Sequence, residues 1–107
     1  MKVRKYDKLV RDRIPDIITA SGSVPVCDRP DKNECLNYLA AKLSEEAAEY
    51  RESRDIEELA DVIEVVRGIL HHNGISWEEL ESVRQKKYDE RGGFEQGIRL
   101  IEVVDEP

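Results

Sequence analysis

The stretch AAKLSEEAAEYRESRDIEELADVI, residues 40–63, decides the fold of this 107-residue chain. On both sides of Ser53 and Arg54, apolar residues recur at the three- and four-residue intervals of one helical face. No glycine or proline interrupts either half. The stretch therefore predicts two antiparallel helices joined by a tight turn near Ser53 and Arg54.

Four carboxylates are placed symmetrically about that turn. The first half carries Glu46 and Glu49, and the second half carries Glu58 and Asp61. Residues three apart share a helical face, so Glu49 should lie level with Glu58 and Glu46 level with Asp61. Carboxylates this close repel one another unless a cation lies among them. Their hard oxygen atoms favour Mg²⁺, with Mn²⁺ as an alternative.

The two helices should extend beyond the quoted stretch. Asp31 followed by Glu34 predicts the start of the first helix, and Asn73-Gly74 predicts the end of the second after Asp55 to His72. The first helix has one apolar stripe, formed by Leu36, Leu39, Ala40, Leu43, Ala47 and Tyr50. The second has a main stripe of Ile56, Leu59, Ile63, Val66 and Leu70, and a second line of Val62, Val65 and Ile69 beside its carboxylates. We expect the acidic face to flank the core of the first helix and to border buried surface on the second.

Shorter signals place the remaining elements. Pro15 should open a short helix that ends near Gly22, and a capping box of Ser76 and Glu79 should open a fourth helix from Trp77 to about Arg91. Residues 24–27 and 98–104 should be extended and able to pair in a small sheet. The sequence predicts a single mainly α domain over residues 1–107, an antiparallel helical bundle.

Two groups of basic residues are candidates for phosphate binding. In the fourth helix the inward side of Leu80 and Val83 continues as cations, namely Arg84, Lys87 and Arg91. These cations could grip phosphate oxygens, or they could pair with glutamates and cover apolar surface. The opening segment carries Lys8, Arg11 and Arg13, which could equally form an exposed charged arm.

Composition narrows the class of protein. The chain has 24 acidic and 17 basic residues, a net charge of −7, which argues against binding of a nucleic acid polymer. We expect no membrane span and no signal peptide, because the chain has no apolar run of about 18 residues and none behind its basic start. With only Cys27 and Cys35, we expect reduced thiols and a cytoplasmic location.

Four motifs together resemble a known family. They are the acidic runs Glu45-Glu46-Ala47-Ala48-Glu49 and Glu57-Glu58-Leu59-Ala60-Asp61, the opening YDKLVRDRIP at residues 6–15, and the closing KYDERGGF at residues 87–94. This combination resembles the all-α, MazG-like nucleoside triphosphate pyrophosphohydrolases, in particular a small branch similar to phosphoribosyl-ATP pyrophosphohydrolase. The resemblance covers nearly the whole chain.

The resemblance implies a Mg²⁺-dependent hydrolase that cleaves between the α and β phosphates and releases a nucleoside monophosphate and pyrophosphate. It implies that the metal ligands are Glu46, Glu49, Glu58 and Asp61, with Glu45 as an alternative to Glu46. In that reading Glu46 or Glu49 orients the attacking water, and Lys8, Arg11, Lys87 and Arg91 contact the phosphates. It also implies a homodimer or a higher homo-oligomer.

Three other functions are compatible with the same residues. The chain could hydrolyse phosphoribosyl-ATP specifically. It could be a helical protein that binds Mg²⁺ and a nucleotide without catalysis. It could also be a plain helical dimerisation module, since acidic helix faces are commonly only solvated.

Overall fold

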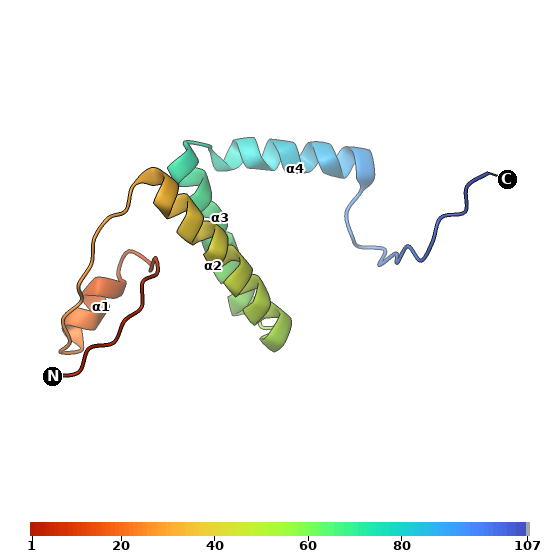
Figure 1. Cartoon of the computed structure of the whole chain (residues 1–107). Coiled ribbons are helices and arrows are strands. Elements are labelled where there is room, and N and C mark those ends of the chain that lie inside the picture. Colours follow the sequence, from red (N-terminus) through yellow and green to blue (C-terminus); the bar gives the residue numbers. More distant parts are fainter. Residues whose placement is uncertain (107) are drawn as a thin grey trace. The chain divides into compact units, whose positions relative to one another are not determined.

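The computed structural model describes residues 1–106, which form four α-helices (Figure 1). They are α1 (Ile14–Ala20), α2 (Lys32–Ser53), α3 (Ile56–Asn73) and α4 (Trp77–Arg91). The described residues contain no β-strand, which confirms the mainly α class. The predicted sheet is wrong for this part of the chain, because neither residues 24–27 nor 98–104 form a strand. Pro25 lacks a backbone N–H for such a ladder, and the valine, leucine and isoleucine side chains of both segments are exposed.

Local signals set the helix ends as predicted. Asp31 caps α2 by accepting a hydrogen bond from the backbone N–H of Glu34 at 2.9 Å. Ser76 and Glu79 form a complete capping box at the start of α4. Gly74 ends α3 in the left-handed conformation, at φ 66°, where a glycine has no Cβ to clash. The four helices therefore begin and end within one or two residues of the predicted bounds.

The turn between α2 and α3 confirms the predicted helical hairpin. Arg54 adopts a left-handed conformation, at φ 63°, and its N–H donates to the Tyr50 carbonyl at 2.8 Å. Asp55 is extended and forms the N-cap of α3. The chain thus reverses direction across two residues, and α2 and α3 pack side by side (Figure 1).

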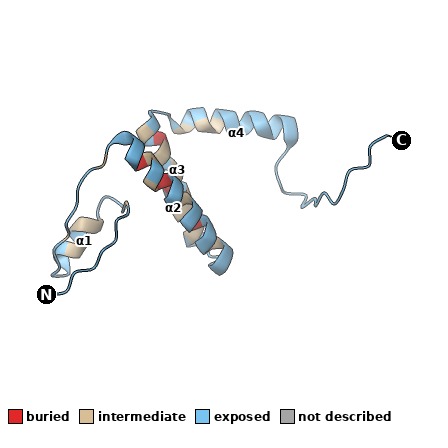
Figure 2. Cartoon of the chain, viewed as in Figure 1, coloured by how far each residue is buried: buried red, intermediate tan, exposed pale blue. Residues whose placement is uncertain are grey.

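The core of the described residues is small and lies between α2 and α3 (Figure 2). Its apolar members are Cys35, Leu39, Val65 and Leu70. At one point the helices approach closely, since a Cβ on Gly68 would lie 3.3 Å from Cδ2 of Leu39. Of the predicted antiparallel bundle, the structure thus confirms the pairing of α2 with α3.

The predicted main stripe of α3 is only partly correct. Its first half is exposed, at 79% for Ile56, 43% for Leu59 and 46% for Ile63. Val65, from the line predicted as secondary, is buried instead. A single partner helix covers one side of α3, whereas the sequence pattern is apolar on two sides.

The chain divides into two compact units, one spanning Met1–Ile75 and the other beginning at Ser76. The first holds α1 and the α2–α3 hairpin, and the second holds α4 and the segment after it. None of the described helices is long and apolar enough to cross a membrane.

Candidate metal centre

The four predicted carboxylates meet between α2 and α3. Glu46, Glu49, Glu58 and Asp61 each offer one oxygen atom, and these atoms all lie within 4.8 Å of one another. We call these four residues the acidic cluster. The two-residue turn keeps the helices in register, so the symmetric spacing in sequence becomes proximity in space. Charges at this separation lie well inside the Debye length of about 10 Å, so salt screens them poorly.

Glu46 is the buried member of the cluster. It is only 7% exposed, and its Oε2 atom has no hydrogen-bond partner in the described residues. Its Oε1 lies 3.8 Å from the ammonium group of Lys42, one helical turn earlier. The expectation that the acidic face of α2 flanks the core is therefore wrong for Glu46, which lies within the face that packs on α3. A buried carboxylate oxygen without a partner is costly unless something binds it.

Burial and repulsion shift the protonation of two cluster members in the same direction. Burial is the largest cause that raises the pKa of Glu46, and the hydrogen bond and charge of Glu49 add to it. Burial also raises the pKa of Glu58, followed by the charge of Glu49. Both shifts mean that the folded chain resists carrying all four negative charges at once. A bound cation would relieve that resistance.

Arg11 reaches the cluster from the opening segment. Its Nη2 donates to Asp61 Oδ1 at 2.6 Å, across 50 residues of sequence. This predicted phosphate contact therefore lies beside the predicted metal ligands. Lys8 does not share that position: its ammonium lies 5.9 Å from the centre of the Tyr6 ring.

Sequence reasoning missed three residues around this site. Lys42 is half-buried beside Glu46, and the four-residue spacing between them was a readable signal. Tyr38 on α2 donates its hydroxyl to Asp7 Oδ1 at 2.9 Å, which attaches the opening segment to the hairpin. The charge of Asp7 and this hydrogen bond raise the pKa of Tyr38, the hydrogen bond being the larger cause. No local pattern links residues 31 positions apart, so sequence alone gave no signal for this pair.

The alternative ligand Glu45 is exposed and is not a member of the cluster. It lies one residue from Glu46, about 100° around the helix. The geometry of the described residues therefore favours Glu46 as the first carboxylate of the set.

The donor set suits a small hard cation. Mg²⁺ binds oxygen at about 2.1 Å, so opposite ligands of one ion lie about 4.2 Å apart. The present spread of 4.8 Å would need to close by a few tenths of an ångström, which rotation of carboxylate side chains can supply. Lys42 and Arg11 offset only half of the four negative charges if all are ionised, so the cluster keeps an excess of negative charge that favours a cation.

The remaining predicted phosphate contacts lie in the second unit, on α4. Arg84 and Lys87 line an open groove together with Tyr88, Gly92, Gly93, Phe94 and Glu95. Arg84 also donates to Glu81 Oε1 at 2.6 Å, and this contact lowers the pKa of Glu81. Arg91 is exposed on the same helix and is not among the residues that line the groove.

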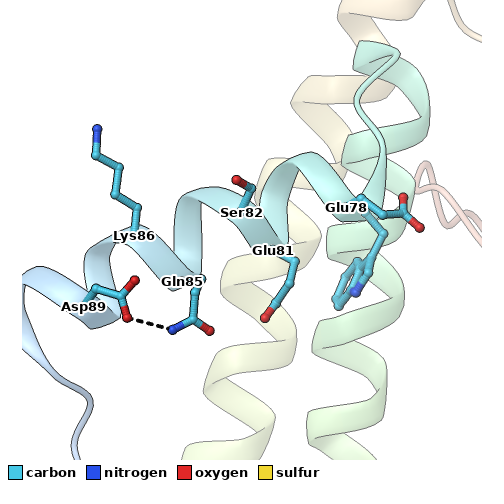
Figure 3. A pocket seen from close by; sticks show the side chains of 7 residues that line it. Glu78, Glu81, Ser82, Gln85, Lys86 and Asp89 are labelled. Carbon is cyan, nitrogen blue, oxygen red and sulfur yellow. Dashed lines mark hydrogen bonds between the residues drawn. The ribbon is translucent and has the colours of Figure 1, made fainter.

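A second groove follows α4 and is more acidic (Figure 3). In it Gln85 donates to Asp89 at 2.9 Å, shown by the dashed line. Its lining residues are Trp77, Glu78, Glu81, Ser82, Gln85, Lys86 and Asp89. Three carboxylates against one lysine do not suit a phosphate group, and none of the predicted site residues lines this groove.

Comparison with curated proteins finds a partial match to an uncharacterized protein. A segment of 44 residues is 52% identical to an uncharacterized protein of Mycolicibacterium smegmatis. The match covers 41% of this chain and 45% of that protein, so the matched part is less than half of the relative's length. No family model matches the chain. No solved structure matches it either.

Proposed function

We propose that this protein is a Mg²⁺-dependent nucleoside triphosphate pyrophosphohydrolase. It would cleave the bond between the α and β phosphates and release a nucleoside monophosphate and pyrophosphate. The observation that carries this proposal is the acidic cluster, which gathers four carboxylates from two helices within 4.8 Å. The resemblance of the acidic, opening and closing motifs to the MazG-like family supports the choice of reaction.

The buried oxygen of Glu46 supports a metal rather than a merely solvated acidic face. Solvated carboxylates point into water, whereas Glu46 is buried and its Oε2 lacks a partner in the described residues. Glu49 is the exposed member, and it lies where a substrate could approach from solvent. The cluster thus combines a buried anchoring ligand with an open side.

The residues of the cluster and Arg11 would have different roles in this proposal. A bound Mg²⁺ would polarise phosphate oxygens and lower the pKa of a bound water. Glu46, Glu49, Glu58 and Asp61 would hold the ion, and a free oxygen of Glu46 or Glu49 would orient the attacking water in line with the α-phosphorus. Arg11 would stabilise negative charge on the phosphates beside Asp61.

The groove on α4, within the second unit, keeps the predicted phosphate-binding residues Arg84 and Lys87 as candidates. Arg84 and Lys87 share their groove with two aromatic rings, Tyr88 and Phe94. Cations next to aromatic surface suit a ligand with both phosphates and a flat base. Lys8 and Arg91 would add longer-range attraction for the anionic substrate.

Pyrophosphate release by the purified chain, with and without Mg²⁺, tests the proposal. The substrates would be the common ribo- and deoxyribonucleoside triphosphates and phosphoribosyl-ATP, because the last compound separates the specialised enzyme from the general one. We expect Glu49→Gln to reduce turnover by more than about 100-fold, since a ligand of the ion is lost. Glu57→Gln is the matched control: its side chain is exposed on α3 and lies outside the cluster.

Two results would contradict the proposal. Full turnover in the Glu49→Gln protein would show that the acidic cluster takes no part in the reaction. Binding of Mg²⁺ and nucleotide without any product, across the whole substrate panel, would instead indicate a non-catalytic nucleotide-binding protein.

A further inference from the structure

Residues 7–11 contact the hairpin at two points, and we call them the strap. At one end Asp7 accepts a hydrogen bond from the Tyr38 hydroxyl on α2 at 2.9 Å. At the other end Arg11 donates to Asp61 on α3 at 2.6 Å. Asp7 has a left-handed backbone, at φ 48°, which aspartate tolerates better than most residues. The strap is thus attached to both helices that build the acidic cluster.

Both Arg11 and an ion in the acidic cluster would bind the carboxylate of Asp61. It is a member of the acidic cluster, and it is also the carboxylate that Arg11 binds. A guanidinium and a divalent ion both seek carboxylate oxygens, and both carry positive charge. A chain with an ion in the cluster would place that ion and the Arg11 guanidinium against the same side chain, where they repel each other.

We propose that Arg11 is an exchangeable cation of the acidic cluster, so that docking of the strap on Asp61 and binding of a divalent ion oppose each other. This inference rests on the metal role assigned to the cluster under the proposed function. The strap holds Asp61 when no ion is bound, and an ion in the cluster releases it. By linkage, the strap weakens ion binding by the same factor by which the ion weakens docking of the strap.

The strength of the Arg11 contact fits exchange. The two side chains of this ion pair are partly exposed, Arg11 at 52% and Asp61 at 37%. Ion pairs between exposed side chains are weak. A divalent ion carries twice the charge, and several carboxylates could hold it at once, including the buried Glu46, whose Oε2 has no hydrogen-bond partner in the described residues. Once released, Arg11 remains next to the cluster, where its planar fork matches two phosphate oxygens. One side chain would then neutralise the empty cluster and later contact a substrate.

Calorimetric titration of the full chain with Mn²⁺, without any nucleotide, tests the exchange. Arg11→Gln should bind Mn²⁺ about five-fold more tightly than the unaltered chain, the factor expected for the upper range of an exposed ion pair. Lys8→Gln is the matched control, because it removes the same charge from the strap but its ammonium lies at the Tyr6 ring. It should change the affinity less than about two-fold. Tyr38→Phe keeps every charge and cuts the other attachment, so it should also tighten binding.

A second readout follows the strap itself. Trypsin should cleave after Arg11 faster in saturating Mn²⁺ than in its absence, because a released strap is a better substrate. In the Arg11→Gln protein, which lacks this cleavage site, cleavage after Lys8 reports the same segment and should no longer depend on Mn²⁺.

The outcomes separate this inference from the proposed function. Unchanged or weaker Mn²⁺ binding in Arg11→Gln would overturn the proposed exchange alone. An equal increase in Mn²⁺ affinity in Arg11→Gln and Lys8→Gln would do the same. An unaltered chain that binds no Mn²⁺ would overturn the strap together with the metal role of the cluster. Pyrophosphate release without Mn²⁺ or Mg²⁺ would overturn the proposed function even if the affinities behave as expected.

Discussion

At the scale of single residues, Glu46 links the stability of the hairpin to pH. Its pKa is raised above the ordinary value of 4.5, with burial as the largest cause. Below pH 4.5 both the folded and unfolded chains hold the proton, and burial of the side chain carries no charge penalty. As the pH rises through the raised pKa, the unfolded chain has already ionised while the folded chain resists. Stability is therefore lost toward higher pH.

We expect Glu46→Gln to remove this loss. In metal-free buffer, the melting temperature of Glu46→Gln relative to the unaltered chain should increase by a few degrees between pH 4 and pH 8. Added Mg²⁺ should raise the melting temperature of the unaltered chain and have little effect on the variant. Thermal unfolding followed by circular dichroism measures both effects.

The neighbouring Glu45 supplies the control for that experiment. Glu45→Gln removes a charge from an exposed side chain outside the cluster, so its melting-temperature difference should not vary with pH in the same way. A Glu46→Gln protein whose relative stability is flat across this range would show that the buried carboxylate carries no charge penalty.

At the scale of helices, Gly68 sets how closely α2 and α3 pack. A Cβ at this position would lie 3.3 Å from Leu39 Cδ2, closer than ordinary contact. Gly68→Ala should change the free energy of unfolding by less than about 0.5 kcal/mol, because a gain in helix propensity of up to about 1 kcal/mol offsets the tight contact. Gly68→Val should lose about 1–3 kcal/mol, because its methyl groups have no space. Urea unfolding measures the series.

A double-mutant cycle checks that Leu39 is the cause. Truncation of Leu39 to Val should cost less in the Gly68→Val protein than in the unaltered chain, since it makes room for the added methyl groups. Strictly additive losses would place the strain of Gly68→Val elsewhere.

The element scale is also where sequence reasoning was most successful. Helix bounds follow from short-range chemistry, such as the caps at Asp31 and Ser76 and the left-handed Gly74, and all three were readable. The acidic cluster was readable for the same reason, because a tight turn converts spacing into proximity. The burial of Glu46 could not be predicted from the sequence, because it depends on how α2 is rotated against α3. The contacts of Asp7 and Arg11 join distant parts of the chain and have no periodic signal.

At the scale of the whole molecule, α3 leaves an apolar row uncovered within the first unit. Ile56, Leu59 and Ile63 follow one helical face and are all exposed. A hairpin of two helices has only one buried side, and its buried apolar residues are few for an independent domain. An exposed apolar row can be covered by the same row of a second copy, because most homodimers pair identical surfaces about a two-fold axis. If the chain forms the homo-oligomer that the family resemblance implies, we expect this row to lie in its interface.

Ile63→Glu should therefore lower the mass of the particle in solution. Light scattering coupled to gel filtration should report an oligomer for the unaltered chain and a monomer for the variant, because a charge in an apolar interface is strongly unfavourable. Ile17→Glu is the control, since it makes the same change at an exposed isoleucine of α1. A monomeric unaltered chain, or an Ile63→Glu protein of unchanged mass, would show that another segment covers the row.

The short connection at Arg54 has a consequence for biosynthesis. Because α2 passes into α3 across two residues, every carboxylate of the acidic cluster falls between positions 46 and 61. Nearest-neighbour helix pairs assemble in microseconds to milliseconds, whereas a ribosome adds about 5–20 residues per second. Once both helices have left the ribosome, the hairpin would thus form faster than the ribosome adds further residues. An ion bound at that stage would hold α2 and α3 together while the chain is still being synthesised.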